Sequence, residues 1–346
     1  AGVMVTASHN PPNDNGYKVY LGGDFGGSQI ISPIDRDIEA KISEVAKTLT
    51  FDEIPKSDTF ERGGESLREA YYDSTLKLVE SHSFNNRLKV VYTAMHGVGL
   101  NTLNEILRRA GANIPVPVTE QVQPDGTFPT TPFPNPEEAG AMDLAFAKAR
   151  AVGADLIIAT DPDADRLAIG IPTAKGFTRL AGDEVGLILA HELATRAGSK
   201  GVMANSIVSS SCLKRVAEAN GLEYRQTLTG FKWIMQVPDL LFGYEEALGY
   251  AVDPSHTPDK DGISAALLAL AIADRISVQG KALGVHLAEL KEKYDYRPTA
   301  QVSVRVESKL AVREILERLI ATPPTELQGN SITVEDLSKP TGSLPP

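Results

Sequence analysis

Three aspartates spaced two residues apart carry the clearest chemical pattern in this chain of 346 residues. Asp161, Asp163 and Asp165 follow an apolar run, and in an extended loop this spacing points their carboxylates to one side. Like charges this close are unfavourable unless a cation or a proton neutralises them. The spacing therefore predicts a cation site.

What the aspartate loop lacks narrows the choice of cation. A calcium-binding EF-hand needs Gly at its sixth position and Glu at its twelfth, where this loop has Arg166 and Pro172. A few carboxylate oxygens, completed by substrate or phosphate oxygens, suit Mg²⁺ better than Ca²⁺. A solvated acidic turn or a helix cap is the alternative interpretation of the same residues.

A polar turn near the start of the chain holds a candidate nucleophile. The run T-A-S-H-N-P-P at residues 6–12 contains Ser8, with Lys18 ten residues beyond it. The hydrolase pattern G-x-S-x-G is not met, because Thr and Asn occupy the glycine positions. His9 is not assumed to be a base, since neighbouring side chains usually point apart. Taken alone, the run favours an Asn-Pro turn with capping side chains.

The elements around the aspartate loop alternate between strands and helices. Apolar runs predict strands at Leu88–Thr93, Ile114–Val118 and Asp155–Ala159. Helices are predicted at Leu100–Ala110 and from an Asn135 N-cap to just before Gly153. This order is typical of a parallel α/β sheet, whose ligands bind at the carboxyl ends of strands, where the aspartate loop lies.

The same patterns continue on both sides of this region. The further predicted strands are Gly2–Thr6, Gly201–Ala204, Glu223–Gln226, Leu240–Gly243 and residues 300–306, where Val302, Val304 and Val306 alternate. The further predicted helices are Ile34–Leu49, Asp183–Ala197, Cys212–Asn220, Gly262–Ile276 and Leu310–Ile320, and residues 51–66 are a predicted linker. We therefore expect repeated α/β domains with mixed parallel sheets and a partial C-terminal α+β domain. The expected domains are 1–68, 69–177, 178–296 and 297–346.

Composition excludes several classes of protein. The chain is 42% hydrophobic and 23% charged, as expected for ordinary globular domains rather than a disordered chain. The chain has no run of about 18 apolar residues, so it has no predicted membrane span. A net charge of −11 argues against general nucleic-acid binding. The single cysteine, Cys212, forms no internal disulfide framework. We expect a cytoplasmic protein. Both ends of the chain look truncated, so we expect a fragment of a longer protein.

The two loops together resemble the α-D-phosphohexomutase superfamily, the family of phosphoglucomutases and phosphomannomutases. The resemblance rests on T-A-S-H-N-P at 6–11, N-G-Y-K at 15–18 and D-P-D-A-D-R at 161–166. It continues in family order with T-G-F-K at 229–232 and G-Y-E-E-A-L-G at 243–249, and it covers nearly all of the chain. The runs Y-T-A-M-H-G at 92–97, F-P-N-P-E-E at 133–138 and D-K-D-G at 259–262 resemble the subgroup with phosphopentomutase and related bacterial hexomutases.

This resemblance implies a four-domain sugar-phosphate mutase whose first three domains share one α/β topology. Ser8 would carry a phosphate and, with the three aspartates, hold one Mg²⁺. The implied reaction moves a phosphoryl group from C1 to C6 of a hexose, or from C1 to C5 of a pentose, through a bisphosphorylated sugar. The implied catalytic set is Ser8, His9, Lys18 and Arg166, with Lys18 in acid–base chemistry. A surface lysine and a local arginine ion pair are the alternative interpretations of Lys18 and Arg166.

The third domain supplies the expected sugar-binding residues. They are Thr229, Gly230, Lys232, Glu245, Glu246 and Lys260. Glu245 and Glu246 follow an apolar strand, and because adjacent residues alternate sides, only one is expected to face the sugar. Surface or capping roles are the alternative for these residues. Gly97 and Gly99 imitate a dinucleotide-binding fingerprint, but its third glycine position holds Thr102, so that interpretation is weak.

The sequence also departs from the family pattern. Ala247 stands where the family often has Ser, which leaves the hexose preference open. The N-terminal arginine-bearing segment and the last domain's R-P-S-G-T loop are missing, and Pro340-Thr341-Gly342 does not replace that loop. These 346 residues are therefore expected to bind Mg²⁺ but to turn over poorly. The expected partner is a small phosphosugar, without nucleic acid or membrane, and the expected state is a monomer or homodimer. A sugar-bisphosphate synthase or phosphatase, and a non-catalytic homologue, are the competing functions.

Overall fold

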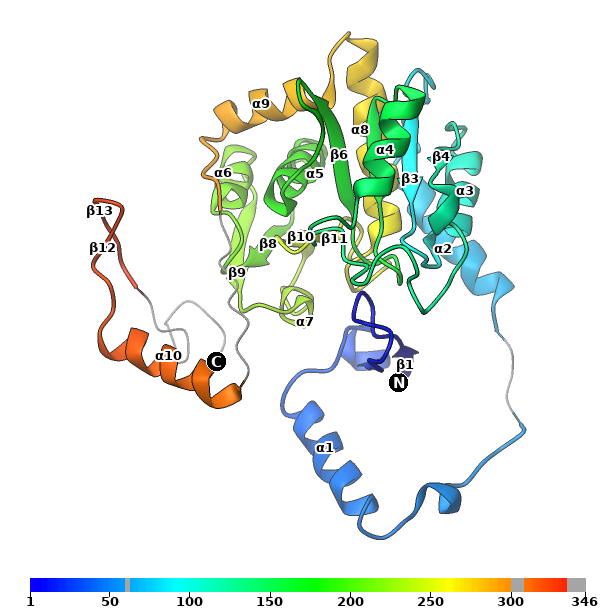
Figure 1. Ribbon diagram of the computed structural model, residues 1–346, viewed down its shortest axis with the longest axis vertical. Helices are drawn as coiled ribbons and strands as arrows, with labels where there is room; N and C mark the ends of the chain where they lie inside the picture. Colours follow the sequence, from blue (N-terminus) through cyan, green and yellow to red (C-terminus); the bar gives the residue numbers. More distant parts are fainter. Residues whose placement is uncertain (60–62, 300–307, 335–346) are drawn as a thin grey trace. The chain divides into compact units, whose positions relative to one another are not determined.

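The computed structural model describes residues 1–59, 63–299 and 308–334 (Figure 1). The chain forms two compact units, Ala1–Arg297 and Pro298–Pro346. In the second unit, α10 (Lys309–Ala321) is followed by a short hairpin of β12 (Glu326–Leu327) and β13 (Asn330–Ser331). The helix predicted at Leu310–Ile320 is confirmed. The strand predicted at 300–306 and the run Pro340–Gly342 both lie outside the described residues.

The first unit begins with a hairpin whose connecting loop carries Ser8. Strand β1 (Gly2–Val5) pairs antiparallel with β2 (Tyr17–Tyr20), and Met4 lies opposite Lys18. The sequence predicts β1 but not β2, which is only four residues long and adjoins a polar turn. Helix α1 (Ile34–Val45) ends before the predicted Leu49, and residues 46–48 form turns.

A five-stranded mixed sheet carries the aspartate loop. Its order is β4-β3-β5-β6-β7, with the first three strands parallel and the last two antiparallel. These strands are β3 (Val90–Thr93), β4 (Val116–Pro117), β5 (Leu156–Ala159), β6 (Ala168–Thr173) and β7 (Gly176–Arg179). The accompanying helices are α2 (Glu65–Lys77), α3 (Gly99–Arg109) and α4 (Asp143–Val152).

The expected helix beginning at Asn135 is wrong. Asn135 is buried, and its Oδ1 accepts a hydrogen bond from the Glu137 backbone N–H at 3.0 Å, which closes a turn. Gly140, at φ +84°, interrupts the backbone before α4 begins at Asp143. The predicted end is right, because Gly153 terminates α4 in the left-handed conformation.

A second mixed sheet positions the third set of loops. Its order is β11-β10-β8-β9, with a parallel core and antiparallel β11 at one edge. The strands are β8 (Val202–Ser206), β9 (Glu223–Thr227), β10 (Leu240–Glu245) and β11 (Gly249–Ala251). The helices are α5 (Gly182–Arg196), α6 (Cys212–Ala219), α7 (Phe231–Ile234), α8 (Gly262–Val278) and α9 (Leu283–Lys293). The expectation of repeated α/β architecture with mixed sheets is confirmed.

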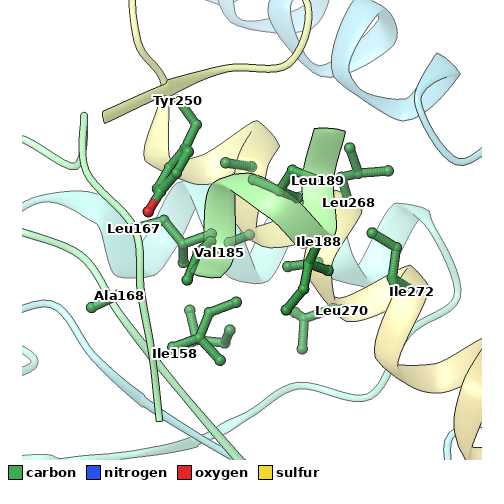
Figure 2. Close-up of a cluster of buried hydrophobic side chains, with 14 of the residues drawn as sticks. Ile158, Leu167, Ala168, Val185, Ile188, Leu189, Tyr250, Leu268, Leu270 and Ile272 are labelled. Atoms are coloured by element: carbon green, nitrogen blue, oxygen red, sulfur yellow. The ribbon is translucent and has the colours of Figure 1, made fainter. Parts of the chain in front are cut away.

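One continuous hydrophobic core joins the two sheets. Helix α8 is apolar around nearly its whole circumference and is buried along almost all its length, as expected for a helix in the centre of a core. Figure 2 shows Leu268 of α8 beside Leu189 of α5 and Leu270 of α8 near Ile188 of α5, with Ile158 of β5 in the same cluster. Because α8 starts beside the aspartate loop, this packing ties the loop to both sheets.

Within the described ranges, no single helix has the length and apolar character needed to cross a membrane. Taken together, α8 and α9 meet these two criteria of length and composition, but the pair is bent by 98°.

Candidate active site

The loop between β1 and β2 presents Ser8 to the aspartates. The Thr6 backbone N–H donates to the Gly16 carbonyl oxygen at 3.0 Å, and the Ser8 backbone N–H donates to Thr6 Oγ1 at 2.9 Å. A Cβ at position 16 would lie 2.5 Å from the Thr6 oxygen, so this closure needs glycine. Ser8 itself has φ +52°, a strained conformation for a non-glycine residue that is often found at functional sites.

Ser8 reaches the aspartate loop across 153 residues of sequence. Its Oγ donates to Asp161 Oδ2 at 2.7 Å and lies 3.1 Å from Asp163 Oδ1. Thr6 Oγ1 donates to Asp163 Oδ2 at 2.9 Å, which gives the two loops a third direct contact. The structure therefore brings the predicted nucleophile and the predicted metal ligands together.

The three aspartates converge on one point after β5. One oxygen from each of Asp161, Asp163 and Asp165 lies within 4.8 Å of the others. Asp165 Oδ1 is buried and has no hydrogen-bond partner among the described residues. An orphaned carboxylate oxygen beside two other carboxylates is the donor set of a hard divalent cation, so these residues could hold a metal ion.

The electrostatics of the cluster show the strain of three close carboxylates. Burial, together with the charges of Asp165 and Asp163, raises the pKa of Asp161 well above its usual range. Burial alone would also raise the pKa of Asp165, but the ammonium groups of Lys260 and Lys18 lower it. The cluster thus needs positive charge, and two lysines supply part of it.

Lys18 and Lys260 meet at the same oxygen of Asp165. Lys18 Nζ lies 2.7 Å from Asp165 Oδ2 and 3.8 Å from Asp163 Oδ2, and Lys260 Nζ forms an ion pair with the same Asp165 oxygen. Burial favours a lower pKa for Lys18, but Asp165 and Asp163 outweigh it and raise the pKa. In this arrangement the Lys18 side chain is therefore held in its protonated form.

His9 lies beside Ser8, and Arg166 lies beside Asp161. His9 Nδ1 is 3.1 Å from Ser8 Oγ, and burial and the Arg166 charge lower the pKa of His9 to about 4. Arg166 lies between two carboxylates, 3.9 Å from Asp161 and 3.9 Å from Glu137. Its Nε, the atom nearest to Asp161, is buried and makes no hydrogen bond among the described residues.

The two glutamates at the end of β10, Glu245 within the strand and Glu246 just after it, have different surroundings. Glu245 Oε1 accepts from the Gly230 backbone N–H at 2.7 Å, and burial raises the pKa of Glu245. Glu246 Oε2 accepts from Ser206 Oγ at 3.0 Å and Ser209 Oγ at 2.6 Å. The two side chains thus take separate partners.

Lys232 is placed away from the aspartate cluster. Its Nζ lies 3.8 Å from Asp35 Oδ2 and 5.5 Å from the centre of the Trp233 ring. Thr229 and Gly230 lie in the loop between β9 and α7. In the T-G-F-K run, the Gly230 backbone N–H contacts Glu245.

Several residues of the site were not found from sequence. Thr6, Glu137 and Asp259 lie within the runs that resemble the family, but none was assigned a role at the site, and Tyr20 lies outside those runs. Their contacts depend on tertiary structure. Gly97 and Gly99, at the start of α3, imitate a nucleotide-binding fingerprint in the sequence. Their observed role is close packing, since Val98 N–H donates to the Pro162 carbonyl oxygen at 2.9 Å.

Replacing Gly97 with alanine is expected to lower the free energy of unfolding by about 1–3 kcal/mol, the usual cost of overpacking. The new Cβ would lie 2.3 Å from the Pro162 carbonyl oxygen, so the two loops must separate. Urea unfolding measures the change. Gly126→Ala is the matched control, because a Cβ there meets nothing within 4 Å. Equal stability of the Gly97 variant and the wild type would contradict this interlocking.

A cavity of about 570 Å³ adjoins the lysine–aspartate contacts. Lys18, Tyr20, Asp165, Asp259 and Lys260 are among the residues that line it. The site as a whole therefore consists of a hydroxyl, three carboxylates and two ammonium groups beside open space, an arrangement suited to phosphoryl transfer, which depends on positioning and charge stabilisation.

Comparisons with known proteins agree with this geometry. Models of the phosphoglucomutase/phosphomannomutase α/β/α domains I, II and III match residues 1–49, 69–174 and 181–294. A protein of Haemophilus influenzae described as "Probable phosphomannomutase" is 46% identical over 331 residues, which cover 95% of this chain and 68% of the relative. The phosphopentomutase of Homo sapiens is 35% identical over 344 residues, covering 92% of this chain and 56% of the relative.

The fold also matches solved structures. A phosphoglucomutase/phosphomannomutase family protein from Burkholderia thailandensis superimposes with a TM-score of 0.70 at 20% identity, covering 94% of this chain and 63% of that one. At this identity the match concerns the fold alone. The chain spans little more than half the length of the human relative.

Proposed function

The chain belongs to the phosphoglucomutase/phosphomannomutase family of the α-D-phosphohexomutase superfamily, and on this basis we propose that it is a Mg²⁺-dependent sugar-phosphate mutase that works through phosphoserine at Ser8. The observation that carries the proposal is the 2.7 Å contact between Ser8 Oγ and Asp161 Oδ2 within the aspartate cluster. The proposed substrates are hexose or pentose monophosphates, and a sugar bisphosphate is the proposed activator and intermediate.

The proposed reaction consists of two opposite phosphoryl transfers. In the first, a sugar hydroxyl oxygen attacks the phosphorus of phosphoserine, the bond from phosphorus to Ser8 Oγ breaks, and a proton passes from the hydroxyl to Oγ. The bisphosphorylated sugar then reorients in the site so that its other phosphate faces Ser8. In the second transfer, Ser8 Oγ attacks the other phosphorus, and the sugar oxygen leaves with the bonding electrons and takes up a proton. The phosphate has then changed position.

The side chains around Ser8 have distinct proposed roles. Lys18, whose raised pKa keeps it protonated, is proposed to donate a proton to the departing oxygen while it takes up the proton of the attacking hydroxyl. Arg166, whose guanidinium makes only long ion pairs with Asp161 and Glu137, is proposed to bind the transferring phosphoryl oxygens. His9 is held neutral next to Ser8 Oγ and orients that hydroxyl.

Mg²⁺ fits the donor set of this site. Asp161, Asp163 and Asp165 provide oxygen ligands only, one of which is an orphaned buried oxygen, and Ser8 Oγ would be the fourth. When bound, Mg²⁺ supplies the positive charge that phosphoryl transfer requires at the equatorial oxygens.

The third-domain glutamates are expected to separate substrate binding from stability. Glu245→Gln should raise the KM for a sugar monophosphate about tenfold, because a carboxylate that accepts two hydroxyl protons is worth more than an amide. Glu246→Gln should instead lower the free energy of unfolding by about 1.5–3 kcal/mol, as its carboxylate holds Ser206 and Ser209.

Steady-state kinetics and urea unfolding on the two variants check this division. The pair is its own control, since the chemical change is the same at neighbouring positions. A larger rise in KM for the Glu246 variant than for the Glu245 variant would reverse the assignment.

The experiment that tests the proposed function follows phosphate in both directions. The 346-residue chain is incubated with Mg²⁺ and glucose, mannose or ribose 1-phosphate plus catalytic glucose 1,6-bisphosphate. Phosphorus NMR reports the 6- or 5-phosphate, and intact mass reports phosphate on Ser8. We expect Ser8 to be phosphorylated even where turnover is slow.

Other outcomes correspond to the competing functions. Net phosphate transfer without isomerisation would indicate a bisphosphate synthase or phosphatase. Absence of both phosphoserine and Mg²⁺ binding would indicate a non-catalytic homologue and overturn the proposal.

A further inference from the structure

The N-terminal hairpin that carries Ser8 and Lys18 is held to the rest of the first unit by polar contacts. Those of Thr6, Ser8 and Lys18 end on the aspartate cluster itself. Their partners are the proposed metal ligands. Contacts that end elsewhere hold the hairpin independently of that cluster.

The most direct of these other contacts joins β2 to the loop before α8. Tyr20 OH donates to Asp259 Oδ2 at 2.7 Å, across 239 residues of sequence. The other oxygen of Asp259 accepts from the Lys260 backbone N–H at 2.8 Å. Burial and the adjacent Asp259 raise the pKa of Tyr20 strongly, so its hydroxyl remains a donor. Both oxygens of Asp259 are thus engaged, one of them by the hairpin.

The position of Tyr20 on β2 couples this contact to Lys18. Residues two apart in a strand share a face, and both Lys18 and Tyr20 line the 570 Å³ cavity. Tyr17, on the same strand, is 62% exposed. Lys18 contacts Asp165, which also contacts Lys260, the neighbour of Asp259. The contacts therefore form a closed ring from β2 through Asp165 and the 259–260 loop back to β2.

From this ring we propose that Tyr20 is a positioning residue for Lys18. Its hydroxyl fixes β2 against Asp259 and so holds the Lys18 ammonium at Asp165, beside the Ser8 phosphoryl site. The inference rests on the proposed function, because it concerns the rate of phosphoryl transfer to Ser8. It assigns a role to the tyrosine and Asp259 that neither loop motif contains.

The test is a single-turnover measurement on the full 346-residue chain. Labelled glucose 1,6-bisphosphate and Mg²⁺ are mixed with excess protein, and label on Ser8 is followed with time. Tyr20→Phe should lower the rate constant at saturating protein about tenfold, with the half-saturating protein concentration within twofold of wild type. Tyr17→Phe is the matched control and should leave both unchanged. Thermal unfolding confirms that each variant is folded.

Two cycles separate positioning from simple docking of the hairpin. Asp259→Asn should cause a similar loss, and adding Tyr20→Phe to it should cause no more. Gln236 Nε2 donates a hydrogen bond to Ser28 Oγ, a contact made by the chain that follows the hairpin. Ser28→Ala removes this contact and should leave the rate unchanged. In a Lys18→Gln background, Tyr20→Phe should have no further effect, whereas a structural role would predict the same tenfold loss.

The possible results divide clearly. A wild-type rate for Tyr20→Phe, an equal loss for Ser28→Ala, or additive losses with Asp259→Asn would each overturn the positioning role. A wild-type chain that takes no label on Ser8 would instead refute the proposed function.

Discussion

Replacing Ser8 with alanine is expected to abolish covalent phosphate on the protein and to lower turnover by a factor on the order of 10⁴ or more, the scale seen when a nucleophile is removed. The reason is geometric. Ser8 Oγ is the hydroxyl directed at both Asp161 and Asp163, while the nearby Thr6 hydroxyl already donates to Asp163 Oδ2. No oxygen of Thr6 is placed to take over the role.

Intact mass after incubation with glucose 1,6-bisphosphate and Mg²⁺ measures the covalent phosphate, and phosphorus NMR measures turnover. Ser28→Ala is the control, since this buried serine contacts Gln236 instead of the aspartates. It should keep wild-type phosphorylation. An alanine variant at position 8 that still gains one phosphate would show that another residue is the nucleophile.

The sequence predicts the aspartate loop and the serine loop separately, but it does not predict that the two loops contact each other. The spacing of Asp161, Asp163 and Asp165 after an apolar run indicates a cation loop at the end of a parallel strand, and β5 lies where that run predicts. The contact of Ser8 with this loop spans 153 residues. Residue types and local spacing carry no information about such a distance, so only family resemblance linked the loops beforehand.

The fold shows the same division between local and tertiary information. Buried strands such as β3 and β5 are found because their residues form apolar runs bounded by polar turns. The antiparallel pair β6 and β7 and the helix α9 were not predicted. Polar and exposed positions near the β6–β7 turn and on α9 obscure their periodicity. Asn135 misled the helix prediction, because a good capping residue is also a good turn residue.

Close approaches of backbone are the least predictable part of the site. Gly97 against Pro162, and Gly262 against the carbonyl oxygens of Ala164 and Arg166, allow loops from three parts of the chain to interlock. In the sequence each is an ordinary glycine near a helix start. Only the partner loop, which arrives from far along the chain, gives these positions their meaning.

A different kind of change separates the metal from the fold. Asp163→Asn is expected to weaken Mg²⁺ binding by about 100-fold or more, since a neutral amide replaces one of three anionic ligands. The amide oxygen can still accept from Thr6 Oγ1, and its nitrogen can donate to Ser8 Oγ, so both contacts survive. The variant thus removes charge with little change in shape.

Stability should respond in opposite directions with and without the metal. In metal-free protein the three carboxylates repel one another, and this repulsion adds to burial in raising the pKa of Asp161. Asp163→Asn should therefore leave the melting temperature equal or higher. Wild-type protein should gain about 2.7 kcal/mol at a Mg²⁺ concentration 100 times its Kd. The variant should gain almost nothing at that concentration.

Thermal unfolding with EDTA and with increasing Mg²⁺ measures both effects in one titration. Asp143→Asn, an exposed change in the first turn of α4, is the control and should keep the full Mg²⁺ response. A Mg²⁺ response that persists in the Asp163 variant would place the cation elsewhere. A loss of stability in EDTA would mean that Asp163 serves the fold more than the metal, because repulsion among the carboxylates would then not be the dominant effect in the metal-free protein.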